Sequence, residues 1–178
     1  MTSSQQLRTR TSACHEAVDV AFGAHDLSRA GSYARVLVAH ARALAPAEAA
    51  LAGVPGLPDW RPRSNLLASD LAALGAPWPA PLPFSIVDAA EAWGTLYVLE
   101  GSRLGNAMLA RQIAADLPSA YMSARHDQGG WRTLLAALDA AGQQGAAGWL
   151  DAAVRGAEAT FALYLAAAGV EDIALATA

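Results

Sequence analysis

The chain has 178 residues, 54% of them hydrophobic and 16% charged, and it carries a formal net charge of −4 at pH 7. This length fits one domain that buries a core and leaves room for a small cofactor, but it is short for two separate cores. The negative charge argues against a nucleic-acid partner, because binding phosphates takes clustered Lys and Arg.

Helix is predicted almost throughout, because alanine and leucine dominate and β-branched residues are sparse. The predicted helices lie at about 2–22, 33–45, 46–51, 64–75, 85–117, 131–141 and 146–168. Pro46 is expected to begin a new short helix, and the alternating prolines from Pro77 to Pro83 are expected to form a stiff connector. The sequence therefore predicts an all-α, single-domain multihelical bundle over 1–178, with a loosely held tail from about residue 170.

The compartment is predicted from what the sequence lacks. Cys14 is the single cysteine, so no intramolecular disulfide can form. The first ten residues have no apolar leader segment, and no run of about 18 apolar residues follows. We therefore expect an untargeted cytoplasmic protein without a membrane partner.

Two glycines stand inside the predicted 85–117 helix. Each costs about 1 kcal/mol relative to alanine, so Gly101 and Gly105 need a compensating role. The residues that share their helix face are Trp93, Tyr97, Leu104 and Met108. One interpretation is a gap between bulky side chains that admits a flat ligand. The alternative is a close crossing of two helices through small residues, and the spacing alone does not decide between them.

Four histidines could carry chemistry. His15 lies on an apolar stripe near the start of the chain, where a hydrogen-bonded core histidine is the more common outcome. His25 and His126 fall in predicted links and are expected to be solvated, while His40 is expected at the rim of the fold.

Several enzyme classes lack their motifs here. A di-iron bundle needs Glu-x-x-His pairs, and the residues three before the histidines are Ser12, Phe22, Leu37 and Ser123. No His-x-x-x-His zinc motif and no Gly-x-Ser-x-Gly nucleophile motif occurs. The glycines around 142–148 lack the strand that a nicotinamide or flavin fingerprint requires.

Two distant segments resemble a known family. The segment 7–15 (LRTRTSACH) resembles the proximal-helix motif of haem oxygenases, and Asp19 fits the acidic position that follows. The segment 96–105 (LYVLEGSRLG) is similar to the distal helix of the bacterial, biliverdin-producing branch often found with bacteriophytochromes. Further similar segments are 61–67, 70–71 and 157–161, so the likeness covers nearly the whole chain.

The resemblance implies how haem b is held. His15 would be the proximal iron ligand, and Gly101 and Gly105 would form the distal backbone over the haem. Arg8 matches a basic position that contacts a haem propionate, and Arg132 matches a second one on a later helix. Ordinary solvated surface arginines are the alternative for both.

The distal helix departs from the animal enzymes. Ser102 stands where they have an aspartate that organises the waters for proton delivery, so proton delivery would rely on backbone groups and water. Gly101, Ser102 and Gly105 are the expected catalytic positions, and Tyr97 is expected to contact the haem. Asn106 replaces a small residue of many relatives and is expected to make the pocket tighter or more polar.

The implied reaction converts haem, O2 and external electrons to biliverdin, carbon monoxide and ferrous iron. Ferredoxin or a flavoprotein reductase is the expected electron donor, and a bacteriophytochrome is a possible recipient of the biliverdin. One alternative is a haem carrier or sensor that keeps the fold and His15 but does not turn over. A second is a helical domain in which His15 and the glycines only pack.

Overall fold

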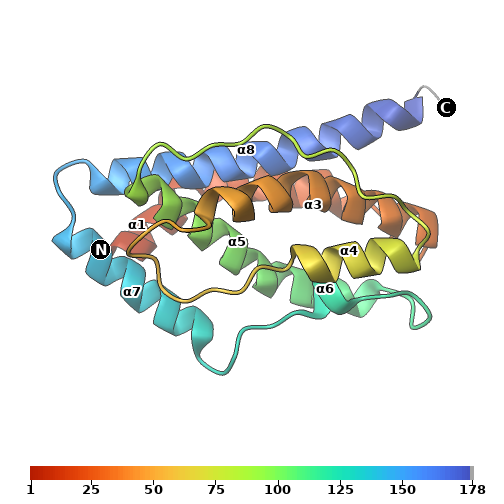
Figure 1. Cartoon of the computed structure of the whole chain (residues 1–178), viewed down its shortest axis with the longest axis horizontal. Coiled ribbons are helices and arrows are strands. Elements are labelled where there is room, and N and C mark those ends of the chain that lie inside the picture. Colours follow the sequence, from red (N-terminus) through yellow and green to blue (C-terminus); the bar gives the residue numbers. More distant parts are fainter. Residues whose placement is uncertain (177–178) are drawn as a thin grey trace.

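The computed structural model describes residues 1–176, and it describes side chains as far as residue 169. In chain order the helices are α1 (Ser3–Arg10), α2 (Ser12–Gly23), α3 (Ala30–Leu51), α4 (Ser64–Ala73), α5 (Ala89–Leu109), the 3₁₀ helix η1 (Ala110–Gln112), α6 (Ala120–Ser123), α7 (Gly130–Gln144) and α8 (Trp149–Ala176). No strand occurs within 1–176, so the predicted all-α class is confirmed (Figure 1). None of the helices in this range is both long and apolar enough to cross a membrane.

The first predicted helix is divided in two at Thr11. Its φ of −105° and ψ of 6° leave the helical range, and both its N–H and its hydroxyl donate to the carbonyl of Leu7, at 3.0 and 2.8 Å. A side-chain hydroxyl that competes for a backbone carbonyl is a known cause of a bend in a helix.

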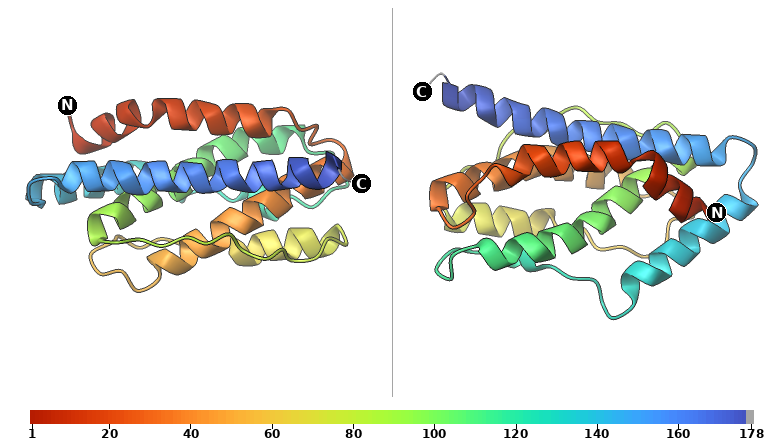
Figure 2. Two further views of the ribbon diagram at one scale, coloured as in Figure 1. Left: turned by 90° about the horizontal axis from the view of Figure 1, so that it is seen from above. Right: turned by 180° about the vertical axis from the view of Figure 1, so that it is seen from behind.

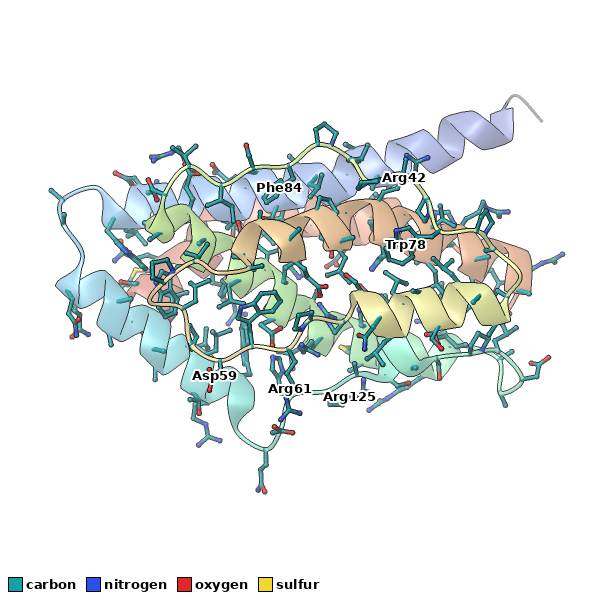
Figure 3. All side chains as sticks on the ribbon, viewed as in Figure 1. Arg42, Asp59, Arg61, Trp78, Phe84 and Arg125 are labelled. Carbon is teal, nitrogen blue, oxygen red and sulfur yellow. The ribbon has the colours of Figure 1, made fainter. Side chains whose placement is uncertain are left out.

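Pro46 does not begin a new helix, contrary to the prediction. It lies inside α3, where the missing proline N–H leaves the carbonyl of Arg42 without its helical donor. The N–H of Leu82 donates to that carbonyl at 3.0 Å. Leu82 belongs to the proline-rich connector 76–88, which also carries Phe84 and runs past Arg42 along the outside of the bundle (Figure 3). The connector therefore supplies the hydrogen bond that the proline removes.

Helix α5 is shorter than the predicted 85–117 segment. It begins after Asp88, whose carboxylate accepts the N–H of Glu91 at 2.9 Å as an N-cap. The short helix α6 was not predicted, because Asp70 of α4 stabilises it by accepting the N–H groups of Ala120 and Tyr121, at 3.2 and 2.9 Å.

A loosely held tail was predicted from about residue 170, but α8 continues as far as Ala176. Residues 177 and 178 of that tail lie outside the described residues.

Helices α5 and α8 cross in backbone contact. A Cβ added to Gly94 would lie 1.8 Å from the carbonyl oxygen of Ala153, and one added to Gly156 would lie 2.1 Å from that of Glu91. Helix α8 also packs on α2 and α3. The left view of Figure 2 shows the second half of α5 turning toward the side of the molecule on which α1 and α2 lie.

Candidate functional site

His15 lies on α2 with an accessible ring, outside the buried part of the apolar stripe. Its side chain is 64% exposed, whereas Leu7 and Phe22 of the same stripe are buried. The Nδ1 atom lies 3.0 Å from Oδ2 of Asp19, one turn later, and the ring stands edge-on to Phe161 with centroids 5.9 Å apart. The carboxylate orients the imidazole through Nδ1, and this leaves Nε2 as the nitrogen that can bind a metal.

The second half of α5 presents an open, apolar face. A Cβ added to Gly105 would meet no atom within 4 Å, and one added to Gly101 would approach only the Trp131 side chain, at 3.3 Å. Leu104 and Met108 of this face are 47% and 70% exposed. The close helix crossing that was the alternative interpretation occurs at Gly94 instead. An uncovered glycine between exposed apolar side chains fits a flat apolar ligand.

One end of this face is framed by three helices. Tyr97 of α5 is half-buried, and burial raises the pKa of its phenol while the guanidinium of Arg8 on α1 partly offsets that rise. The ring centroid of Trp131 on α7 lies 5.5 Å from that of Tyr97. Arg8 and Arg132, the residue after Trp131, are exposed at this end. The structure therefore brings a cation, a phenol and an indole together next to Gly101.

The hydroxyl of Ser102 points into the protein. It donates to the carbonyl of Leu99 at 2.7 Å and accepts a hydrogen bond from Nη2 of Arg63 at 2.9 Å. Arg63 is 2% exposed and also donates to Leu99, at 2.7 Å. Its Nη1 has no hydrogen-bond partner among the described residues. Arg63 thus contacts the distal helix from within the core, and sequence reasoning gave it no role of its own.

A buried polar cluster lies behind α5. Nδ1 of His40 is 2.8 Å from the hydroxyl of Tyr121, and the guanidinium of Arg63 lies 5.2 Å from the centre of the Tyr121 ring. Burial lowers the pKa of His40 to about 3, so the ring is neutral. The expectation that His40 lies at the rim is wrong, because it is packed between the rings of Phe22 and Tyr164. Asn106 of α5 is buried on this side, turned away from the open face.

His126 was expected to be solvated, and this too is wrong. Its side chain is 13% exposed, and Nε2 lies 3.1 Å from the carboxylate of Glu100. Glu100 in turn accepts from Nε of Arg103 at 2.8 Å. A pocket of about 240 Å³ opens beside this cluster, and Arg61 and Arg125, labelled in Figure 3, are among the residues that line it. It lies beside the buried face of α5 rather than beside Gly105.

No family model matches the chain. A curated relative from Xanthomonas campestris pv. campestris (strain 8004), "Heme oxygenase", is 36% identical over 150 residues, which is 75% of this chain and 86% of the relative. Among solved structures, the NO- and CO-bound haem oxygenase from Neisseria meningitidis matches with a TM-score of 0.78 and 22% identity, over 96% of this chain and 92% of that one. The second likeness shows that the two proteins share a fold.

Proposed function

Because the chain belongs to the haem oxygenase family, we propose that it binds haem b through His15 and cleaves it with O2 and external electrons to biliverdin, carbon monoxide and ferrous iron. Two observations carry the proposal: His15 on α2 is accessible and oriented by a carboxylate, and the backbone of α5 is bare at Gly105. His15 would hold the haem iron, and the bare backbone at Gly105 would let the flat macrocycle lie against α5.

The proximal side depends on His15 and Asp19. The Asp19 carboxylate holds the proton of the imidazole on Nδ1, so that Nε2 presents its lone pair to iron. The edge of the Phe161 ring limits how far the imidazole can rotate. The contacts with Asp19 and Phe161 fix the orientation of the His15 imidazole before haem binds.

The distal side depends on the shape of α5. At Gly105 the absent Cβ lets the haem plane approach the helix backbone, and Leu104 and Met108 supply apolar contact and exclude water. Arg8 and Arg132 bind the propionates by charge-assisted hydrogen bonds, and Tyr97 packs against the same edge. Bound haem supplies the redox-active iron and the macrocycle that is oxidised.

Proton delivery is proposed to involve backbone groups and water rather than a distal carboxylate. The hydroxyl of Ser102 donates a hydrogen bond to the carbonyl of Leu99 and accepts one from Arg63. We therefore propose that Ser102 acts by anchoring α5 on Arg63. The same arrangement favours a second candidate function, a haem carrier of this fold that does not turn over. Turnover is therefore the part of the proposal that most needs its own test.

The remaining parts of the proposal follow from the family resemblance in the sequence. Electrons come from ferredoxin or a flavoprotein reductase, and the biliverdin is passed to a bacteriophytochrome, as in the bacterial branch that the distal segment resembles. The reaction takes place in the cytoplasm.

The experiment is a haem titration followed by turnover. The wild-type chain and a His25→Ala control are expected to give a Soret band typical of histidine ligation, whereas His15→Ala is expected to lose it while keeping its helix content. Adding ascorbate, or ferredoxin with its reductase, then produces biliverdin from the wild-type complex. Unchanged iron ligation in His15→Ala would refute the site. Normal ligation without biliverdin would favour the carrier.

A further inference from the structure

Several independent contacts hold Trp131 of α7 against α5. It is the second residue of α7, which begins after Gly129 in the left-handed conformation at φ 79°. Its ring lies between two others, with centroids 5.5 Å from Tyr97 and 5.8 Å from His126, each tilted by 38°. Its Cη2 atom lies 3.3 Å from where a Cβ of Gly101 would be. The indole occupies the space that this glycine leaves.

The segment before Trp131 is fixed to α5 as well. His126 reaches the buried carboxylate of Glu100 at 3.1 Å. Arg125 donates to the carbonyls of Met122 and Ala107, at 3.2 and 3.4 Å. Because these contacts precede the indole, they determine where α7 begins relative to α5. The indole therefore has a fixed position beside Gly101.

The Trp131 indole lies at the margin of the open face of α5. Gly105, one turn beyond Gly101, has no neighbour within 4 Å of its Cβ position, so the space beside the indole is free along α5. A cavity of about 400 Å³ adjoins Trp131 and is lined in part by Leu104 of the open face and by Arg132. A flat ligand on the open face would therefore meet the indole where Leu104 and Arg132 lie.

We propose that Trp131 determines the rotational seating of haem in its own plane, and thereby which meso carbon lies under the Gly101–Gly105 backbone and is attacked. The inference rests on the proposed function. The four edges of the macrocycle differ little in shape, so an apolar site alone discriminates poorly between seatings. The rigid indole lies next to Tyr97, whose phenol feels the charge of Arg8, and shares a cavity lining with Arg132; it would admit one arrangement of vinyl and propionate groups at that edge and obstruct the others.

The test compares Trp131→Ala and Trp131→Phe with a matched Trp78→Ala control. Trp78 is 44% exposed in the connector, at the far end of the bundle from α7 (Figure 3). Haem seating is read by proton NMR of the ferric cyanide complex, and the biliverdin isomers are separated after turnover. The wild type is expected to show one dominant seating. In Trp131→Ala its ratio to the next seating is expected to fall about tenfold, the loss of a contact worth about 1.4 kcal/mol.

Trp131→Phe keeps a flat ring and is expected to retain most of the preference, and Trp78→Ala all of it. If Trp131→Ala does not fold, Trp131→Leu provides the same test, because it keeps an apolar side chain beside Gly101 but removes the flat ring. An even mixture of seatings in the wild type, or unchanged ratios in both Trp131→Ala and Trp131→Leu, would overturn the inference. A wild-type chain that binds no haem would defeat the proposed function instead.

Discussion

Gly94 and the carbonyl oxygen of Ala153 are so close that a Cβ on the glycine would lie 1.8 Å from that oxygen. Eleven residues later in the same helix, a Cβ on Gly105 would meet nothing. Gly94 is needed for the packing of α5 on α8 inside the protein, whereas Gly105 leaves a gap in the protein surface. The same substitution at the two positions should therefore separate stability from haem binding.

Gly94→Ala is expected to destabilise the haem-free chain by at least about 1–3 kcal/mol, because α5 and α8 must move apart to admit the methyl group. Urea unfolding followed by circular dichroism measures this change. A stability equal to that of the wild type would mean that the two helices are not in backbone contact at this crossing.

Gly105→Ala is expected to leave the haem-free chain as stable as the wild type or to raise its free energy of unfolding by up to about 1 kcal/mol, the helix preference for alanine. Its affinity for haem and its rate of biliverdin formation are expected to fall, because the methyl group occupies the face that haem must approach. Haem titration and single-turnover kinetics check both effects. Normal binding and turnover would show that haem does not contact α5 at this residue.

Asp19→Asn is expected to speed haem loss by about tenfold, since the orienting carboxylate of His15 becomes a neutral amide. The pair is largely exposed, so a larger effect is not expected. The rate is measured by transfer of haem to an excess of apomyoglobin. Glu16→Gln removes the same charge from an exposed neighbouring position of α2 and is expected to have no effect. Equal rates in the two variants would contradict the role of Asp19.

The stability of the haem-free chain is expected to fall as the pH drops from about 6.5 toward 3. The unfolded chain binds a proton at His40 below the ordinary pKa of 6.5, whereas burial holds the folded pKa at about 3. One such proton changes the free energy of unfolding by about 1.4 kcal/mol per pH unit at most. Burial lowers the pKa of His126 as well, and this acts in the same direction.

A His40→Gln variant isolates the contribution of His40, because the amide can still bond the Tyr121 hydroxyl but does not titrate. Urea unfolding at pH 7, 6, 5 and 4 should give a shallower loss of stability in this variant. Parallel curves for the variant and the wild type would show that His40 is not the group responsible.

The helices were predictable where local signals decide them. Apolar spacing and propensity placed most helices, and the prolines between 77 and 83 marked the connector correctly. The failures come from contacts that are distant in sequence. The helix at Ala120–Ser123 depends on Asp70, and α3 passes Pro46 with help from Leu82. No local pattern encodes either partner.

The candidate site, like the fold, was predictable from the sequence only in part. The resemblance proposed roles for His15, Gly101 and Gly105. The structure exposes His15 and Gly105 and places Trp131 beside the half-buried Gly101, and the contact of all three with haem stays a prediction. Sequence reasoning missed Trp131 and Arg63. Nothing in their neighbourhoods in the sequence distinguishes an indole that fills the space beside a glycine, or a guanidinium that holds a serine, from ordinary packing and surface residues.

Pro46 has a consequence for protein engineering. Replacing a proline inside a helix by alanine normally stabilises the helix, because it restores one hydrogen bond. Here the restored N–H would approach a carbonyl of Arg42 that already accepts the N–H of Leu82, so the gain is expected to be smaller. The proline thus leaves the Arg42 carbonyl to Leu82, and this hydrogen bond ties the connector to α3.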